Sequence, residues 1–229
     1  MTEIFTNALT VVTPLHSVVW NLFLAVIPVV VAFSIVRLSR LHSMRSGRGI
    51  FMMLPILFVW LIFLPNTCYL MSEWRHFINN IAGSPLIQQV HQNNRNAVLA
   101  MLAATAFYCV YTGCGMLCFF LAVWPLDHRF KMVLGKFRML FGATVFLLCS
   151  LGVYLGLVER YNSWDPAKLS RLKAIIGDVS TVLRHPVLVG LILLYGAMLW
   201  ISYAVFDVWM DGLIFRVAAV RRRTRLGDA

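Results

Sequence analysis

Five long apolar segments constrain the fold of this chain more than any other feature. An α-helix needs about 20 apolar residues to cross the hydrocarbon core of a membrane. The segments that reach this length are approximately residues 16–36, 50–71, 97–124, 139–158 and 186–206. Of the 229 residues, 60% are hydrophobic and 13% are charged, whereas a soluble domain carries about 25% charged residues. We therefore predict an all-α integral membrane bundle of about five transmembrane helices, forming one domain over residues 1–229.

Most of the 20 basic residues follow the first, third and fifth segments. The positive-inside bias then places the N-terminus outside and the C-terminus in the cytoplasm. The net charge of +11 lies at segment ends, where lipid headgroups explain it better than nucleic acid does. We expect membrane lipids and other membrane proteins as partners, and no nucleic acid. Residues 1–14 contain no Lys or Arg, so we expect no cleavable signal peptide.

Two stretches outside these segments have amphipathic periodicity. In the outer loop 159–185, apolar residues recur at helical spacing and predict an interfacial helix over 166–184. The cytoplasmic tail 208–229 has a shorter stripe that begins at Trp209 and ends at Val220. It predicts a second interfacial helix over 208–224. The other outer loop is expected at 72–96.

The interiors of the segments contain essentially no Asp, Glu, Lys or Arg. Such charges mark ion paths and proton relays, so their scarcity argues against a transporter. No His lies in mid-membrane to hold a haem, Cys114 and Cys118 are interpreted as packing residues, and Asp207 and Asp211 as a solvated cytoplasmic face. We assign no cofactor and no metal ligand from the sequence.

The first polar motif runs from Pro65 to His76 at the outer end of the second segment. Asn66 can satisfy the carbonyl that Pro65 leaves free, or bind a ligand. If the helix continues, Tyr69, Glu73 and His76 share one face. Glu73 and His76 can then form an acid/base pair or part of a metal site. The alternative is an ordinary helix end with solvated polar residues.

The second polar motif runs from Glu159 to Pro166. Asp165 followed by Pro166 is typical of an N-cap and a first helical residue, which would start the interfacial helix. Capping does not explain why Arg160 and Asn162 lie together just after the outer end of the fourth segment. Asn21, near the outer end of the first segment, would lie at a similar depth. In the preceding segment, Gly152 and Gly156 form a GxxxG pattern, for which we favour packing within the chain over a dimer interface.

Three stretches carry a resemblance to a known family. They are the run from Trp20 to Pro28, the run from Trp60 to Asn66 with Tyr69, and the run from Asn162 to Asp165. Together they resemble the bacterial multi-pass membrane family called domain of unknown function 1361. Ser72-Glu73 and Leu157 depart from its pattern, which has Thr-Asp or Thr-Glu and an Arg there. The resemblance implies a multi-pass membrane protein, here expected in the bacterial cytoplasmic (inner) membrane, and no activity.

We therefore expect a polar pocket at the outer face. Its binding residues would be Asn21, Asn66, Tyr69, Arg160 and Asn162, and its candidate catalytic residues would be Glu73, His76 and Asp165. The favoured function is a non-catalytic accessory, assembly or lipid-binding protein. The alternatives are an enzyme acting on a lipid or lipid-linked substrate at the outer leaflet, with Arg160 holding a phosphate, and a small transporter component.

Overall fold

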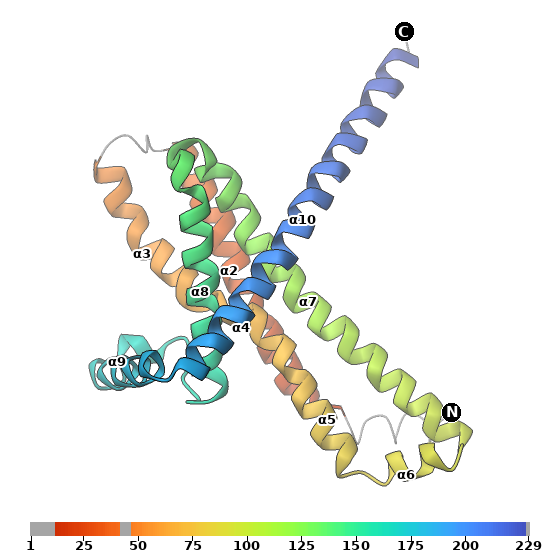
Figure 1. Ribbon diagram of the computed structural model, residues 1–229. Helices are drawn as coiled ribbons and strands as arrows, with labels where there is room; N and C mark the ends of the chain where they lie inside the picture. The colour runs from red at the N-terminus through yellow and green to blue at the C-terminus, as the bar shows by residue number, and fades with distance from the viewer. Residues whose placement is uncertain (1–11, 42–46, 228–229) are drawn as a thin grey trace.

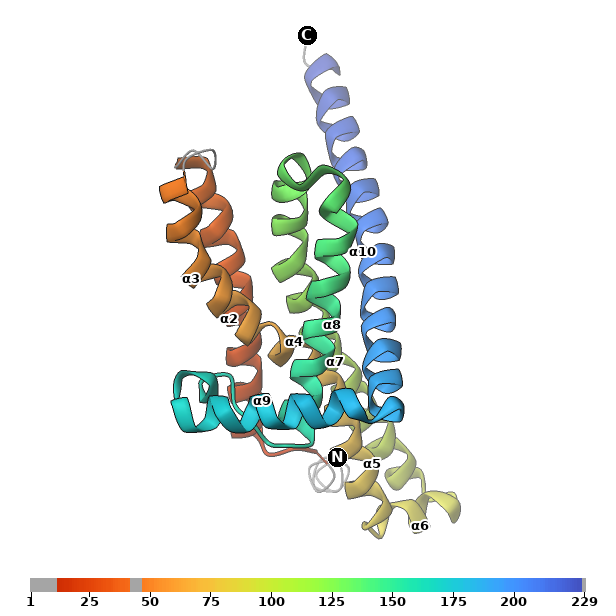
Figure 2. The same ribbon diagram turned by 60° about the vertical axis from the view of Figure 1, so that its left-hand side comes forward.

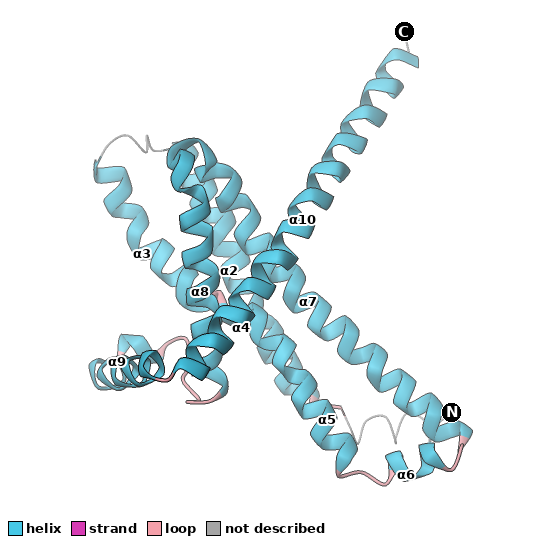
Figure 3. Ribbon diagram, viewed as in Figure 1, coloured by secondary structure: helices cyan, strands magenta, loops and turns pink. Residues whose placement is uncertain are grey.

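The computed structural model describes residues 12–41 and 47–227. Figure 3 shows that all regular structure in these residues is helical, which confirms the predicted all-α class. Five segments are long and apolar enough to cross a membrane. They are Leu15–Arg40, Met53–Ala82, Arg95–Lys131, Gly135–Leu157 and Pro186–Val220. The expected segments all fall within this set, apart from a few terminal residues.

Five long helices form the bundle (Figures 1 and 2). They are α2 (Leu15–Leu41), α3 (Gly47–Phe63), α7 (Arg95–Leu134), α8 (Arg138–Leu157) and α10 (Pro186–Gly227). Buried aromatic and aliphatic side chains from these helices, among them Trp60, Phe119, Phe146 and Leu199, form the main core. The helix α9 (Leu169–Arg184) lies across one end of the bundle, which we call the α9 end (Figure 2). The opposite end contains the short turn η2 (Gly135–Phe137).

The second membrane segment is broken at Pro65. After α3, the chain continues as α4 (Pro65–Tyr69), η1 (Leu70–Glu73) and α5 (Trp74–Ala82). Pro65 has no backbone N–H and clashes with the preceding turn, so carbonyl groups there need other donors. The Asn66 side-chain amide donates to the Phe63 carbonyl at 3.0 Å. From α10, the Tyr195 hydroxyl donates to the Cys68 carbonyl at 3.2 Å.

Two glycines allow α4 to lie close to its neighbours. A Cβ atom added to Gly152 of α8 would lie 2.4 Å from the Pro65 ring. One added to Gly115 of α7 would lie 2.7 Å from the Thr67 carbonyl oxygen. Both distances are shorter than van der Waals contact. Gly152 therefore serves packing within the chain, as the sequence interpretation favoured.

Most of the stretch expected as the outer loop 72–96 is helical. It contains α5 and α6 (Leu86–His91), and α6 packs on the first turns of α7. Leu70, Phe77, Leu86 and Tyr108 belong to a second buried cluster there. The 40 residues of α7 span about 60 Å, roughly twice the hydrocarbon thickness. The part of α7 that exceeds this thickness offers a helix surface against which the apolar residues of the stretch 72–96 are buried.

The tail does not form a separate interfacial helix over 208–224, so that prediction was wrong. Instead α10 runs unbroken for 42 residues and projects beyond the bundle (Figure 1). No proline interrupts it after Pro186. The stripe that suggested an interfacial helix is exposed on this projection, with Trp209 at 59% and Val217 at 46% exposure.

The predicted interfacial helix 166–184 is present as α9, but it begins at Leu169. Asp165 does not cap it, so the capping prediction was wrong. Asp165–Ala167 form a separate 3-10 turn, η3, and Lys168 in an extended conformation precedes α9. Lys168, in its extended conformation, separates the turn that contains Pro166 from the amphipathic residues of α9.

Candidate functional site

A cavity of about 430 Å³ opens at the α9 end between α2, α4, α8, α9 and the loop 159–166. The lining includes all five residues that the sequence suggested for binding. They are Asn21, Asn66, Tyr69, Arg160 and Asn162. The lining also includes aliphatic side chains, among them Leu24, Leu61 and Leu155. The cavity therefore presents both polar and apolar side chains to one space.

Hydrogen bonds hold the loop 159–166 against α4. The Asn66 side-chain amide donates to the Ser163 hydroxyl at 2.7 Å. The Asp165 carboxylate, which is buried, accepts from the Asn162 backbone N–H at 2.8 Å. Asp165 is thus a structural group of the loop, and it is not among the residues that line the cavity.

A further bond ties this loop to α9. The Tyr161 hydroxyl donates to the Asp178 carboxylate at 2.6 Å. That hydrogen bond, together with desolvation and the negative charge of Asp178, raises the pKa of the Tyr161 phenol above its ordinary value. The phenol therefore stays protonated throughout the physiological range, and the loop remains linked to the helix that covers the cavity.

Among the residues that the structure describes, Arg160 is the one charged residue of the cavity lining. Its backbone has φ = 60°, a left-handed conformation that is unfavourable for a residue with a Cβ and that gathers at functional sites. The side chain is exposed, and no carboxylate lies within 4.0 Å of it among the described residues. The guanidinium is therefore free to bind an anion that enters the cavity.

Glu73 does not line the cavity and is buried, with 3% exposure. Its carboxylate contacts the Thr13 hydroxyl and the Asn21 side-chain amide, each at 3.5 Å. Both contacts are at the limit of hydrogen bonding. The Asn21 amide also donates to the Tyr111 hydroxyl at 3.1 Å, and Thr13 bonds the Tyr108 hydroxyl at 2.7 Å. Asn21 therefore connects the cavity to a buried network around Glu73.

The three candidate catalytic residues do not share one surface of this cavity. His76, on α5, lies near enough to Glu73 for their charges to interact. Asp165 belongs to the loop, where its carboxylate accepts the bond from Asn162. None of the three is among the lining residues. Sequence reasoning did not find Thr13, Tyr108 or Tyr111, because no local pattern connects these positions to Glu73.

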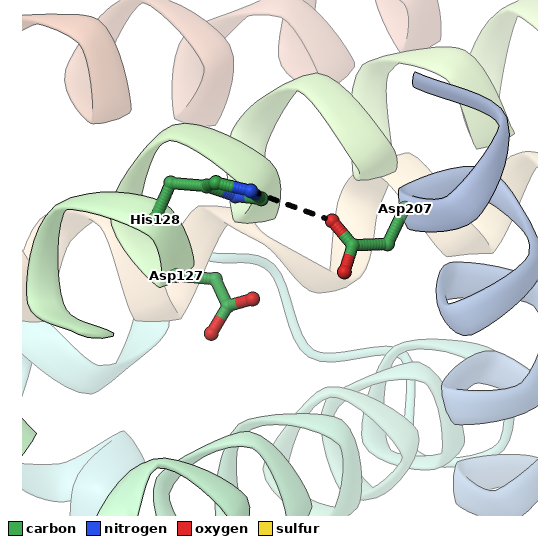
Figure 4. A group of neighbouring side chains, drawn as sticks. All are labelled: Asp127, His128 and Asp207. Carbon is green, nitrogen blue, oxygen red and sulfur yellow. Dashed lines mark ion pairs between the residues drawn. The ribbon is translucent and has the colours of Figure 1, made fainter. Parts of the chain in front are cut away.

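The opposite end of the bundle holds a second polar cluster (Figure 4). Arg138 of α8 binds both oxygens of Asp127 on α7, with Nε to Oδ1 at 2.7 Å, and the Tyr203 hydroxyl donates to Asp127 at 3.0 Å. His128 Nε2 lies 3.7 Å from Asp207 Oδ1 and 3.8 Å from Asp211 Oδ1. Figure 4 shows His128 and Asp207 facing each other from different helices.

The sequence interpretation of Asp207 and Asp211 as a merely solvated face is incomplete. Both residues interact with His128, and Asp207 also lies 3.8 Å from Arg138. Their i, i+4 spacing places them on one helix face, and Asp127-His128 is a second polar pair. These signals were visible in the sequence, but only the packing of α7 against α10 brings them together.

This fold defines an all-α integral membrane protein with five spanning helices and polar groups at both ends of the bundle. A family model described as "Protein of unknown function (DUF1361)" matches residues 20–202. The chain therefore belongs to that family, which confirms the resemblance. No curated protein and no solved structure matches the chain.

Proposed function

We propose that this protein is a non-catalytic lipid-binding protein of the bacterial cytoplasmic membrane, which holds an anionic phospholipid of the outer leaflet in the α9-end cavity. One observation carries the proposal. The cavity lining combines one cation, Arg160, with amide and hydroxyl side chains and with aliphatic side chains, and no other charged residue of the described part of the chain lines it. A phospholipid has these same three parts in one molecule.

Each part of the cavity suits a part of the lipid. A guanidinium binds phosphate through paired hydrogen bonds. The amide of Asn162 and the hydroxyl of Tyr69 can bond glycerol oxygens. Leu24, Leu61 and Leu155 offer an apolar surface for an acyl chain. A soluble phosphate compound would leave this apolar surface uncovered, so the proposed ligand is a lipid.

The charge of the lining favours a lipid with net negative charge. No carboxylate of the described residues lines the cavity, so the ammonium of phosphatidylethanolamine would find no partner of opposite charge among them. Phosphatidylglycerol carries hydroxyl groups in that position. A desolvated cation without a partner is costly, so phosphatidylglycerol is the preferred occupant.

The amphipathic character of α9 supports placing the cavity at the depth of the lipid headgroups. Leu169, Ile176 and Leu183 on this helix are 71%, 61% and 70% exposed. An amphipathic helix with an exposed apolar face and basic residues lies in the membrane interface. Ile175 of the same helix lines the cavity. A cavity beside such a helix would face headgroups and the first carbons of the acyl chains.

The test is native mass spectrometry of the purified full chain with phosphatidylglycerol and phosphatidylethanolamine in equal amounts. We expect preferential retention of one phosphatidylglycerol. Arg160→Ala should reduce this preference at least tenfold, which corresponds to about 1.4 kcal/mol. The matched control is Arg184→Ala, because Arg184 is an exposed arginine near the same end that does not line the cavity. Inorganic phosphate should not displace the lipid.

Three results would overturn the proposal. The first is equal retention of both lipids by the wild-type chain. The second is an Arg160→Ala variant that is correctly folded and keeps the full preference. The third is displacement of phosphatidylglycerol by inorganic phosphate at equal concentration, which would mean that the site recognises phosphate alone and that the lipid assignment fails.

An enzyme acting on a bound lipid is the second candidate, and Glu73 is the observation that favours it. A carboxylate that is 3% exposed and has only long contacts is typical of active-site acids and bases. The test is to incubate wild type, Glu73→Gln and His76→Ala with membrane lipids and to compare the lipid masses. A new lipid product that requires Glu73 would replace the non-catalytic proposal.

A further inference from the structure

We propose that His128, Asp207 and Asp211 bind one divalent transition-metal ion at the end of the bundle opposite α9. This inference is independent of the lipid cavity, because it uses different residues at the other end of the molecule. Figure 4 shows Asp207, which comes from α10, and His128, which comes from α7. Asp211 also belongs to α10. The ion would therefore join two helices that are distant in sequence.

The distances fit a shared ion better than direct bonds. His128 Nε2 is 3.7 Å from Asp207 Oδ1 and 3.8 Å from Asp211 Oδ1. Both separations are longer than a hydrogen bond, for which about 3.2 Å is the usual upper distance. Two ligand atoms that each lie about 2.0–2.2 Å from one ion are separated by roughly 3–4 Å. His128 Nε2 therefore lies at the spacing of a neighbouring ligand from each of the two carboxylates, and one ligand atom each from Asp127, His128 and Asp207 lies within 4.8 Å of the others.

The backbone fixes the orientation of the histidine ring. His128 Nδ1 lies 3.2 Å from the Trp124 carbonyl oxygen. Because a carbonyl oxygen only accepts, Nδ1 must carry the hydrogen. In the neutral ring Nε2 then has a free lone pair, and it faces the two carboxylates. A histidine that donates one ring N–H to a carbonyl and presents the other nitrogen is the usual arrangement of a metal ligand.

A buried oxygen of Asp207 gives a separate reason for an ion. Asp207 Oδ1 is inaccessible to solvent and has no hydrogen-bond partner among the described residues. Its other oxygen, Oδ2, faces Arg138 at 3.8 Å. Buried polar atoms without a partner are rare because they lose their hydration without compensation. A cation between Asp207, Asp211 and His128 supplies the missing partner.

The charge balance indicates a divalent ion. The cluster contains three carboxylates, from Asp127, Asp207 and Asp211, and one guanidinium, from Arg138. Asp127 is bound by Arg138 and Tyr203, so it is not counted as a ligand although it lies close to His128 and Asp207. Two negative charges are left for the ion. One imidazole and two carboxylates suit Zn²⁺ and its neighbours in the first transition series.

The experiment measures Zn²⁺ binding to the full chain in detergent, without a histidine tag and after treatment with a chelator. Isothermal titration calorimetry should show one ion per chain. His128→Ala, Asp207→Asn and Asp211→Asn should each weaken binding at least tenfold. His185→Ala is the matched control, since this histidine lies between α9 and α10, at the α9 end, and should leave binding unchanged. Arg160→Ala should also bind Zn²⁺ normally, which separates this inference from the lipid proposal.

Co²⁺ substitution of the wild-type chain decides the question if the variants fail to fold. A bound Co²⁺ with visible absorption and without thiolate charge-transfer bands supports the site and excludes the cysteines as ligands. Absence of stoichiometric Zn²⁺ and Co²⁺ binding overturns it. So does a His128→Ala variant that binds Zn²⁺ as tightly as wild type. If NMR shows that His128 gains a proton as the pH falls and no ion binds, the contacts with Asp207 and Asp211 are ion pairs of a protonated histidine, and the metal site is excluded.

Discussion

The two ends of the bundle each contain an arginine among polar groups, and the two arginines are held differently. At the end opposite α9, Arg138 binds both oxygens of Asp127 and lies near Asp207. At the α9 end, Arg160 is exposed, lines a cavity and has no carboxylate within ion-pair distance among the described residues. The comparison teaches that a charge satisfied by its own chain stabilises the fold, whereas one left without a partner is available to a ligand.

The largest difference between the ends should appear when each arginine is removed. Arg138→Ala leaves Asp127, which is 13% exposed, with Tyr203 as its one remaining hydrogen-bond partner among the described residues. Loss of one partner of a buried pair costs about 3–5 kcal/mol, and we expect about 3 kcal/mol because Arg138 is partly exposed. Arg160→Ala should change the free energy of unfolding by less than about 0.5 kcal/mol. Denaturant unfolding in mixed micelles measures both.

A double variant shows whether the cost comes from the unpaired charge. Asp127→Asn combined with Arg138→Ala should be less destabilised than Arg138→Ala alone, because the uncompensated carboxylate is gone. Equal unfolding free energies for Arg138→Ala and Arg160→Ala would contradict the distinction between the two ends.

The next effect concerns the wall of the cavity. Gly152→Ala places a methyl group 2.4 Å from the Pro65 ring, and such overpacking costs about 1–3 kcal/mol. Gly190 in α10 has nothing within 4 Å of an added Cβ, so Gly190→Ala should stabilise its helix by up to about 1 kcal/mol. Thermal unfolding of the two variants should shift in opposite directions. A stable Gly152→Ala protein would show that α4 can move away from α8.

The sequence predicted more of the α9 end than of the opposite end, for physical reasons. Hydrophobic length defined the five spans, because crossing a bilayer requires a fixed number of apolar residues. Asn66 and Arg160 were identified because polar residues at a membrane boundary are conspicuous among apolar ones. Asp165 was wrongly assigned to the cap of α9, because it belongs to the separate turn η3 and Lys168 lies between that turn and α9.

The cluster around His128 was not predicted, because its residues also have a simple explanation as solvated ends of separate helices. Only the register of α7 against α10 brings His128 near Asp207. The unbroken α10 was missed for a related reason. A stripe of apolar residues predicts a helix but does not tell whether that helix is separate from the one before it.

A smaller effect is expected from the loop that carries Arg160. Asp165→Ala removes the acceptor of the Asn162 N–H and should destabilise the protein by about 1 kcal/mol. Asp165→Asn keeps a carbonyl oxygen at that place and should lie closer to wild type. Phosphatidylglycerol retention should fall with Asp165→Ala, since Arg160 and Asn162 lose their fixed positions. Unchanged stability and retention would show that the loop is positioned by Ser163 and Tyr161 alone.

The smallest effect is expected at Tyr161, and it concerns pH. The hydrogen bond to Asp178 raises the pKa of the Tyr161 phenol. A group whose pKa is higher in the folded state stabilises the fold below its unfolded value, here about 10, and loses that contribution as the pH rises through the folded value. Resonances of ¹³C-labelled tyrosine rings should therefore show Tyr161 ionising above pH 10 in wild type and at a lower pH in Asp178→Asn. Tyr161→Phe removes this contribution and should lower stability at neutral pH slightly, and by less than Arg138→Ala at the other end does at the same pH. An unshifted Tyr161 titration in Asp178→Asn would mean that desolvation, and not the bond to α9, protects the phenol.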